Sequence, residues 1–147
     1  FKIKKKTTGK ILDDVARIKL TKVGLNYNHG TGHGVGYLSN VHETPPSISK
    51  FSKDKIYCGN VTSNEPGFYK KGAFGVRLEN LIYLNNYKMF ENLTLVPFES
   101  SMIINSMLTK IERNWINNYH EEIYEKIHKF LNDAEKNFLK KCCLKIN

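Results

Sequence analysis

The pattern of apolar and polar positions at the start of the chain is helical. Residues 8–21 place a group of apolar side chains near one side of a helix and charged side chains on the other. These apolar residues are Ile11, Leu12, Val15, Ala16 and Ile18. Gly24 follows them, and glycine commonly ends a helix because it adopts the left-handed backbone conformation without strain. We therefore predict a covering helix over residues 8–21.

The middle of the chain is rich in β-branched and aromatic residues, which favour strands. Three such stretches, residues 56–69, 74–84 and 92–98, are separated by glycine, proline and asparagine turns. Ahead of them, Pro45 and Pro46 lack a backbone N–H, so residues 42–55 are predicted to form a loop. The middle of the chain is therefore predicted to be a β layer.

From residue 109 onward, apolar residues recur at every fourth position, which is typical of an amphipathic helix. The recurring residues are Ile111, Trp115, Tyr119, Ile123, Ile127 and Leu131. Thr109 and Glu112 have the spacing of a capping box, and Asn132 and Glu135 repeat that spacing. A long helix followed by a short helix is therefore predicted.

The order of these elements, a helix, then strands, then helices, predicts an α+β fold in one domain of ordinary size. His120 and His128 have polar neighbours in the long helix, so we expect them at solvated positions and not as ligands.

No stretch reaches the roughly 18 apolar residues of a membrane-spanning helix. The basic start of the chain lacks the apolar block of a signal peptide. The 3 cysteines lack a metal-binding or disulfide spacing, which favours a reducing compartment.

The net charge of +9 raises the question of whether the chain binds nucleic acid. Only Arg17, Arg77 and Arg113 of the 23 basic residues are arginine, whereas phosphate and base contacts favour arginine. The lysines are spread along the chain, so a solvated lysine-rich surface explains the charge better than a nucleic-acid partner.

Because the first residue is Phe1 and not Met, we expect the chain to be a segment of a longer protein.

The stretch NYNHGTGHGVGYLSNVHE, residues 26–43, sets His29, His33 and His42 among alternating glycines. The glycine spacing does not match the dinucleotide-binding pattern GxGxxG. His29 and His33 have the i, i+4 spacing of a zinc-protease helix, but Gly30 replaces the required glutamate, and each glycine in a helix costs about 1 kcal/mol. The remaining interpretation is an extended backbone that something approaches closely and from which the histidines project.

Two carboxylates on the downstream strands are candidates to complete such a site. Glu65 in SNEPG and Glu79 in RLEN stand in apolar or turn contexts, where an unpaired buried charge is costly. A metal ion would keep both carboxylates ionised and an imidazole neutral. The spacing alone is equally consistent with exposed strand glutamates and ordinary loop histidines.

Four motifs in this order, HGTGHGVGYLSNVHE, SNEPGFYKKGAFGVRLEN, LTLVPF and WINNYH, closely resemble eukaryotic-type aminopeptidase P, the Xaa-Pro aminopeptidases of the pita-bread metallopeptidase family. The resemblance covers nearly the whole chain. It implies that residues 1–85 are the C-terminal half of a pita-bread catalytic domain, an α+β fold with an antiparallel sheet covered by helices. Residues 86–147 resemble the family's C-terminal extension, a strand followed by two helices.

The resemblance implies that His33, Glu65 and Glu79 are metal ligands of a centre of two divalent ions, most often Mn²⁺. The family needs two further aspartate ligands, on strands that precede the segment where this chain begins. Asp13 and Asp14 do not replace them, because they match the helix after those strands. The segment alone is therefore expected to be inactive, and its partner would be the missing N-terminal portion of the same protein.

The same resemblance gives His29 and His42 contacts with the scissile peptide and gives Arg77 the role of orienting the carboxylates. The reaction implied is metal-assisted hydrolysis of peptides with proline at the second position. A cytoplasmic homodimer without a nucleic-acid or membrane partner is expected. One departure is Thr44, which stands beside His42 where the family commonly has glycine. The alternative is a catalytically inactive pita-bread protein that acts as a binding module.

Overall fold

The computed structural model describes residues 3–4, 6–38 and 40–147. The chain divides into two compact units, one that ends at Thr94 and one that begins at Leu95, and each is described by itself. No helix in the described part of the chain is both long enough and apolar enough to cross a membrane.

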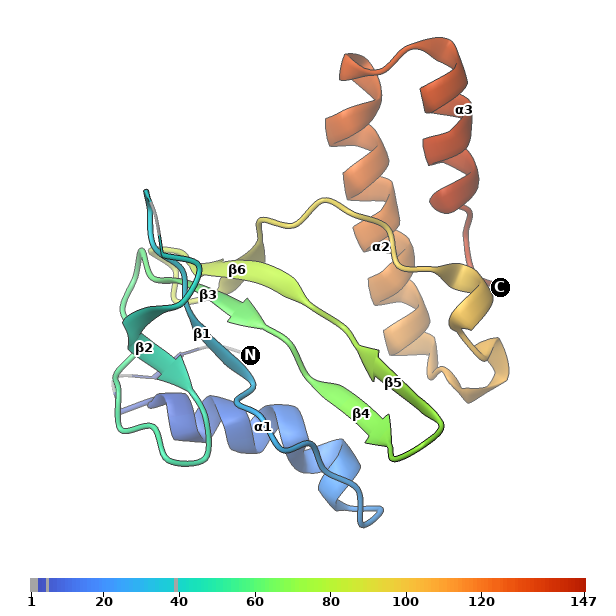
Figure 1. Cartoon of the computed structure of the whole chain (residues 1–147). Helices are drawn as coiled ribbons and strands as arrows, with labels where there is room; N and C mark the ends of the chain where they lie inside the picture. The colour runs from blue at the N-terminus through green and yellow to red at the C-terminus, as the bar shows by residue number, and fades with distance from the viewer. Residues whose placement is uncertain (1–2, 5, 39) are drawn as a thin grey trace. The chain divides into compact units, whose positions relative to one another are not determined.

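The first unit contains a five-stranded antiparallel sheet in the order β2, β1, β3, β6, β7. These strands are β1 (Gly32–Gly34), β2 (Glu43–Ile48), β3 (Val61–Asn64), β6 (Asn80–Leu84) and β7 (Phe90–Asn92). An antiparallel hairpin of β4 (Gly67–Lys70) and β5 (Phe74–Arg77) extends from β3 and β6 (Figure 1). The predicted β layer is confirmed, although residues 56–69 and 74–84 each contain a strand of the sheet and a strand of the hairpin.

β2 contains Pro45 and Pro46, so the prediction of a loop over residues 42–55 is wrong for the part up to Ile48. β2 lies at the edge of the sheet, where a missing N–H need not pair on the open side. Its pairing with β1 shifts register, so that residues 44–46 fall in an irregular part of the ladder. The two prolines therefore disturb few ladder hydrogen bonds.

α1 (Gly9–Thr21) forms where a helix was predicted. The side chains that α1 buries include those of Leu12, Asp13 and Arg17. Three of the apolar side chains expected on the covering side stay exposed in this chain: Ile11, Val15 and Ile18. The predicted division between an apolar and a charged side is therefore wrong for Asp13 and Arg17. Their burial is tolerated because the two side chains pair with each other and residues 26–31 satisfy their remaining donors and acceptors.

α1 runs alongside the sheet (Figure 1), and the core of the first unit joins the two. Its buried residues are Ile3, Leu12, Ile48, Ile56 and Leu84, with Phe90 packed against them. Side chains from α1, β2 and β6 thus meet in one apolar cluster. This packing fixes the position of α1 against β2 and β6.

The second unit is helical. Its elements are η1 (Ser100–Met102), η2 (Asn105–Met107), α2 (Lys110–Ile127), η3 (His128–Phe130) and α3 (Asp133–Cys142). Both predicted capping boxes are present, at Thr109 with Glu112 and at Asn132 with Glu135. The two helices pack through a cluster formed by Tyr119, Ile123 and Leu139.

Two sequence predictions near this unit are wrong. The strand expected over residues 92–98 ends at Asn92, because the backbone N–H of Leu81 donates to the hydroxyl of Thr94 and the ladder stops there. His120 is fully buried and not solvated, and the backbone N–H of Phe98 donates to its Nε2 atom over 3.1 Å. Burial lowers the pKa of His120. The α+β class with an antiparallel sheet and covering helices is confirmed.

Candidate active site

β1 and the loops on its two sides carry the three histidines. His29 precedes β1, His33 is its central residue, and His42 stands directly before β2. The connecting loop returns His42 to His33, so that the centroids of the two imidazole rings lie 4.1 Å apart. The structure therefore brings His33 and His42 together, with His33 half-buried and His42 exposed.

The glycines in β1 lie where the neighbouring strands leave no room for a side chain. A Cβ atom on Gly32 would overlap the carbonyl oxygen of Ser63 in β3, and one on Gly34 would overlap that of Glu43 in β2. Only glycine allows β1 to approach both neighbours this closely. The close approach expected from the sequence is therefore made by the backbones of adjacent strands.

His33 and Glu65 face each other at the end of β3. The Nδ1 atom of His33 donates to the carbonyl oxygen of Gly34 over 2.8 Å, because a carbonyl oxygen only accepts. The Nε2 atom of His33 lies 3.4 Å from the Oε1 atom of Glu65. Ser63 ties the two together, since its hydroxyl donates to Oε1 over 2.9 Å and accepts from the backbone N–H of His33 over 3.0 Å.

This pair has the donor chemistry of a divalent metal site. With Nδ1 protonated, the neutral imidazole presents its Nε2 lone pair toward a carboxylate oxygen. Two lone pairs that face each other repel, and either a second proton on the imidazole or a cation removes the repulsion. One imidazole nitrogen and carboxylate oxygens form a ligand set that suits divalent ions such as Mn²⁺. His33 and Glu65 therefore fit the metal that the sequence predicted.

Glu79 lies across from Glu65 at the junction of the sheet and the hairpin. Asn64 pairs with Asn80 in the sheet and Gly67 pairs with Arg77 in the hairpin, and the same register sets Glu65 opposite Glu79. Glu79 is exposed. Within residues 3–4, 6–38 and 40–147, no three His, Cys, Asp or Glu side chains gather closely enough to hold a metal ion. The ligand role of Glu79 stays a prediction.

Arg77, on β5, contacts the other oxygen of Glu65. Its Nη1 atom lies 3.4 Å from Oε2 of Glu65, and its Nε atom donates to the hydroxyl of Tyr69 over 2.9 Å. The hydrogen bond to Tyr69 raises the pKa of Arg77, and the charges of Glu65 and Glu79 raise it further. Arg77 is therefore placed to hold Glu65, as a residue that orients a carboxylate would be.

Tyr69 is a site residue that the sequence patterns did not single out. Its hydroxyl lies 2.9 Å from Nε2 of His29, whose Nδ1 atom donates to the carbonyl oxygen of Gly30. The hydroxyl accepts from Arg77, so its own proton goes to His29. Gly67 and Gly75 flank Tyr69 on the hairpin, and a Cβ atom on either would come within 3.0 Å of its ring. Gly67 and Gly75 are the sequence feature that could have indicated Tyr69, because the absence of their side chains leaves room for its ring.

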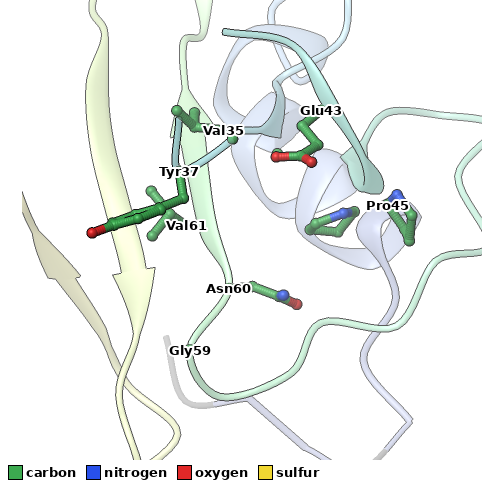
Figure 2. A pocket seen from close by; sticks show the side chains of 10 residues that line it. Val35, Tyr37, Glu43, Pro45, Gly59, Asn60 and Val61 are labelled. Atoms are coloured by element: carbon green, nitrogen blue, oxygen red, sulfur yellow. The ribbon is translucent and has the colours of Figure 1, made fainter. Parts of the chain in front are cut away.

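A cavity of about 510 Å³ lies beside the histidine-bearing strand (Figure 2). Glu43 and Pro45 of β2 line it together with Val35, Asn60 and Val61. None of the six predicted site residues is among the described residues that line it. The cavity is therefore distinct from the pair formed by His33 and Glu65.

Residues 2–86 match metallopeptidase family M24, and residues 83–146 match the C-terminal region of peptidase M24. The first match alone covers more than half of the chain. The chain belongs to metallopeptidase family M24. The predicted membership of the pita-bread metallopeptidases is thereby confirmed.

Several proteins that this chain resembles are named as Xaa-Pro aminopeptidases. A probable Xaa-Pro aminopeptidase P of Arthroderma gypseum is 43% identical over 89% of this chain and 23% of its own length. The structure resembles X-prolyl aminopeptidase of Caenorhabditis elegans, a cytosolic enzyme with a di-nuclear active site, with a TM-score of 0.87 and 34% identity over 99% of this chain. X-Pro aminopeptidase of Thermotoga maritima matches 63% of the chain with a TM-score of 0.56 and 37% identity.

The chain spans about a quarter of the length of these relatives, from 23% of the fungal protein to 26% of both crystallised enzymes. The predicted resemblance to Xaa-Pro aminopeptidases over nearly the whole chain is confirmed.

Proposed function

We propose that this chain is the C-terminal part of the catalytic domain of a metal-dependent Xaa-Pro aminopeptidase. Such an enzyme releases an N-terminal residue that precedes proline. The observation that carries the proposal is the pair of His33 and Glu65, whose facing atoms lie 3.4 Å apart while hydrogen bonds hold each group in place. The names of the relatives that match most of the chain support the same reaction.

In this proposal His33, Glu65 and Glu79 hold two divalent ions, with Mn²⁺ as the expected metal. When bound, such ions act as Lewis acids on the carbonyl group and lower the pKa of the attacking water. Ser63 keeps His33 and Glu65 at a fixed spacing through its two hydrogen bonds. The strand register sets Glu79 across from Glu65, which supports a shared centre.

The substrate contacts are proposed for His29 and His42, which would stabilise the charge that develops on the scissile peptide. Arg77 would act indirectly, by orienting other residues, because its Nη1 atom contacts Glu65 and its Nε atom donates to Tyr69. An Xaa-Pro amide has no N–H, so a site shaped for proline leaves no buried donor without a partner. This property explains a preference for proline at the second position.

The rest of the centre is proposed to come from outside this chain. Two aspartate ligands would be supplied by an N-terminal portion of the same protein, so the isolated chain would bind metal weakly and hydrolyse nothing. Residues 1–85 would belong to the catalytic domain and residues 86–147 to the C-terminal extension. A cytoplasmic homodimer is the proposed form of the whole enzyme, as the cytosolic relative of Caenorhabditis elegans suggests for the compartment.

The test is hydrolysis of an Xaa-Pro peptide by the intact protein loaded with Mn²⁺. We expect release of the first residue and a loss of this activity in Glu79→Gln, with Glu91→Gln, at the exposed residue of β7, as the matched control. His29→Ala is expected to lower kcat while bound Mn²⁺ stays unchanged. Unchanged turnover in Glu79→Gln would overturn its ligand role, and absence of any Xaa-Pro hydrolysis by the loaded intact protein would overturn the proposed function.

A further inference from the structure

A buried ion pair on α1 holds the segment that carries His29. Asp13 is fully buried and Arg17 is only 8% exposed. The Nε atom of Arg17 donates to Oδ2 of Asp13 over 2.7 Å. The proposed function gives neither residue a role, although both lie on α1 and contact the histidine-bearing stretch, residues 26–43.

The other donors of Arg17 reach the residues before β1. Its Nη1 atom donates to the side-chain oxygen of Asn26 over 2.6 Å and to the backbone oxygen of Tyr27 over 2.7 Å. Its Nη2 atom donates to the backbone oxygen of His29 over 2.6 Å. The guanidinium carbon also lies 3.7 Å from the centroid of the Tyr27 ring. One rigid planar group thus holds the backbone at Tyr27 and at His29 and packs on the ring of Tyr27.

Asp13 holds the same segment on the far side of His29. The hydroxyl of Thr31 donates to Oδ1 of Asp13 over 2.6 Å and also shares a hydrogen bond with the hydroxyl of Tyr27. The ring of His29 packs against that of Tyr27, with centroids 4.8 Å apart. The residues held on the two sides of His29 are therefore Tyr27 and Thr31, and the ring of His29 packs on the ring of Tyr27.

Stability alone does not account for a charged pair in this place. Burying two charges removes them from water, and apolar side chains of similar size are often equally or more stabilising. Burial alone would lower the pKa of Arg17, but the hydrogen bond to Asp13 and the electrostatic interactions with Tyr27 and Asp13 raise it, so the guanidinium stays charged. What an apolar side chain cannot provide is a set of donors in fixed directions.

We infer that Arg17 and Asp13 are positioning residues that fix the backbone on both sides of His29 and so set its imidazole ring for the scissile peptide. The inference rests on the proposed function for the role of His29 in contacting the substrate. The contacts that hold His29 in place do not depend on that function. It predicts that loosening the pair moves His29 while leaving His33 and Glu65 in place, since those two are tied by Ser63.

The test compares Arg17→Lys and Arg17→Ala with wild type in the intact protein. Lysine keeps the charge but cannot make the branched set of hydrogen bonds. We expect hydrogen exchange of residues 26–31 to rise roughly tenfold or more in both variants. We expect kcat for an Xaa-Pro peptide to fall about 10- to 100-fold, with KM and bound Mn²⁺ nearly unchanged. A cavity of about 640 Å³ borders Arg17 and His29, so millimolar guanidinium should restore Arg17→Ala and ammonium should not.

Leu84→Ala, in the core of the same unit, is the control for general loss of stability. It should lower the unfolding temperature without a selective fall in kcat and without rescue by guanidinium. Arg17→Lys with wild-type kcat, or with wild-type exchange over residues 26–31, would overturn the inference, as would an equal loss of kcat in Leu84→Ala. If the wild-type protein hydrolyses no Xaa-Pro peptide, the proposed function fails, whereas the exchange measurement still decides whether Arg17 holds the segment.

Discussion

Nε2 of His33 lies 3.4 Å from Oε1 of Glu65, and the remaining contacts of both groups prevent either one from turning away. Gly34 accepts the Nδ1 proton of His33, and Ser63 and Arg77 hold the two oxygens of Glu65. Whenever Nε2 of His33 carries no proton, its lone pair faces the carboxylate oxygen, and a cation between the two atoms removes the repulsion. Hydrogen bonds that hold both groups at this spacing reduce the reorganisation that binding of a cation would require.

Glu65→Gln should separate metal binding from folding. The new amide can donate to Nε2 of His33, so the metal-free protein should unfold at the same temperature as wild type or higher. Affinity for Mn²⁺ should fall by more than the roughly 10- to 100-fold typical of losing an outer partner. Calorimetry of unfolding with and without Mn²⁺ measures both effects, with Glu91→Gln as control. Equal stabilisation of Glu65→Gln and wild type by Mn²⁺ would show that Glu65 is not a ligand.

Tyr69→Phe tests the link between Arg77 and His29. The change removes the hydroxyl that accepts from Arg77 and donates to His29, while the ring still fills the space above Gly67 and Gly75. We expect kcat on an Xaa-Pro peptide to fall about 10- to 100-fold, with bound Mn²⁺ unchanged. Tyr57→Phe, at an exposed tyrosine of the same unit, is the matched control. Wild-type kcat in Tyr69→Phe would remove the residue from the site.

The sequence predicts those parts of the fold and site that local patterns determine. Helical period, capping boxes and strand composition identified α1, α2, α3 and the β layer, because each depends on neighbours a few residues apart. The alternation of glycine and histidine identified β1, since a crowded strand excludes side chains on the positions occupied by Gly32 and Gly34. In each case the signal lies in residues close together in the sequence, although the neighbour that crowds Gly32 is Ser63 in β3.

Features that depend on distant partners were missed. The burial of Asp13 and Arg17 follows from hydrogen bonds to residues 26–31, and no helical pattern contains that information. The prolines of β2 fit a strand only because that strand lies at an edge. Buried His120 accepts its hydrogen bond from the backbone N–H of Phe98, 22 residues away along the chain. In each case tertiary contacts overrode a local preference.

Gly32→Ala should strain the contact between β1 and β3. The added Cβ atom would overlap the carbonyl oxygen of Ser63, so the strands must separate at a cost of about 1–3 kcal/mol in free energy of unfolding. Because Ser63 also sets the spacing of His33 and Glu65, affinity for Mn²⁺ should fall as well. Native-state hydrogen exchange and metal titration of the intact protein measure the two effects.

Gly30→Ala is the control for this substitution. A Cβ atom there would stand 3.2 Å from the carbonyl oxygen of Ile48, a contact that a small shift relieves. We expect the cost to be clearly smaller than in Gly32→Ala, with Mn²⁺ affinity nearly unchanged. Equal effects of the two substitutions would show that crowding by β3 is not what requires glycine at position 32.

His120 should make the second unit sensitive to acid. The backbone N–H of Phe98 donates to Nε2, so Nε2 must stay unprotonated in the folded state, and within the described part of the chain Nδ1 has no hydrogen-bond partner. The pKa of His120 is therefore lower in the folded state than in the unfolded state, where it is about 6.5. The unfolded state then binds more protons as pH falls below that value, so stability decreases until the pH reaches the folded pKa and then levels off.

Native-state hydrogen exchange of α2 in the intact protein, corrected for the intrinsic effect of pH, measures this loss between about pH 7 and pH 5. His120→Phe should be less stable at neutral pH, since Phe98 loses its acceptor, but should lack this part of the pH dependence. His128→Gln should retain it, because His128 is only half-buried and its Nδ1 atom donates to the backbone oxygen of Tyr124. If α2 loses as much stability between about pH 7 and pH 5 in His120→Phe as in wild type, another group controls the transition.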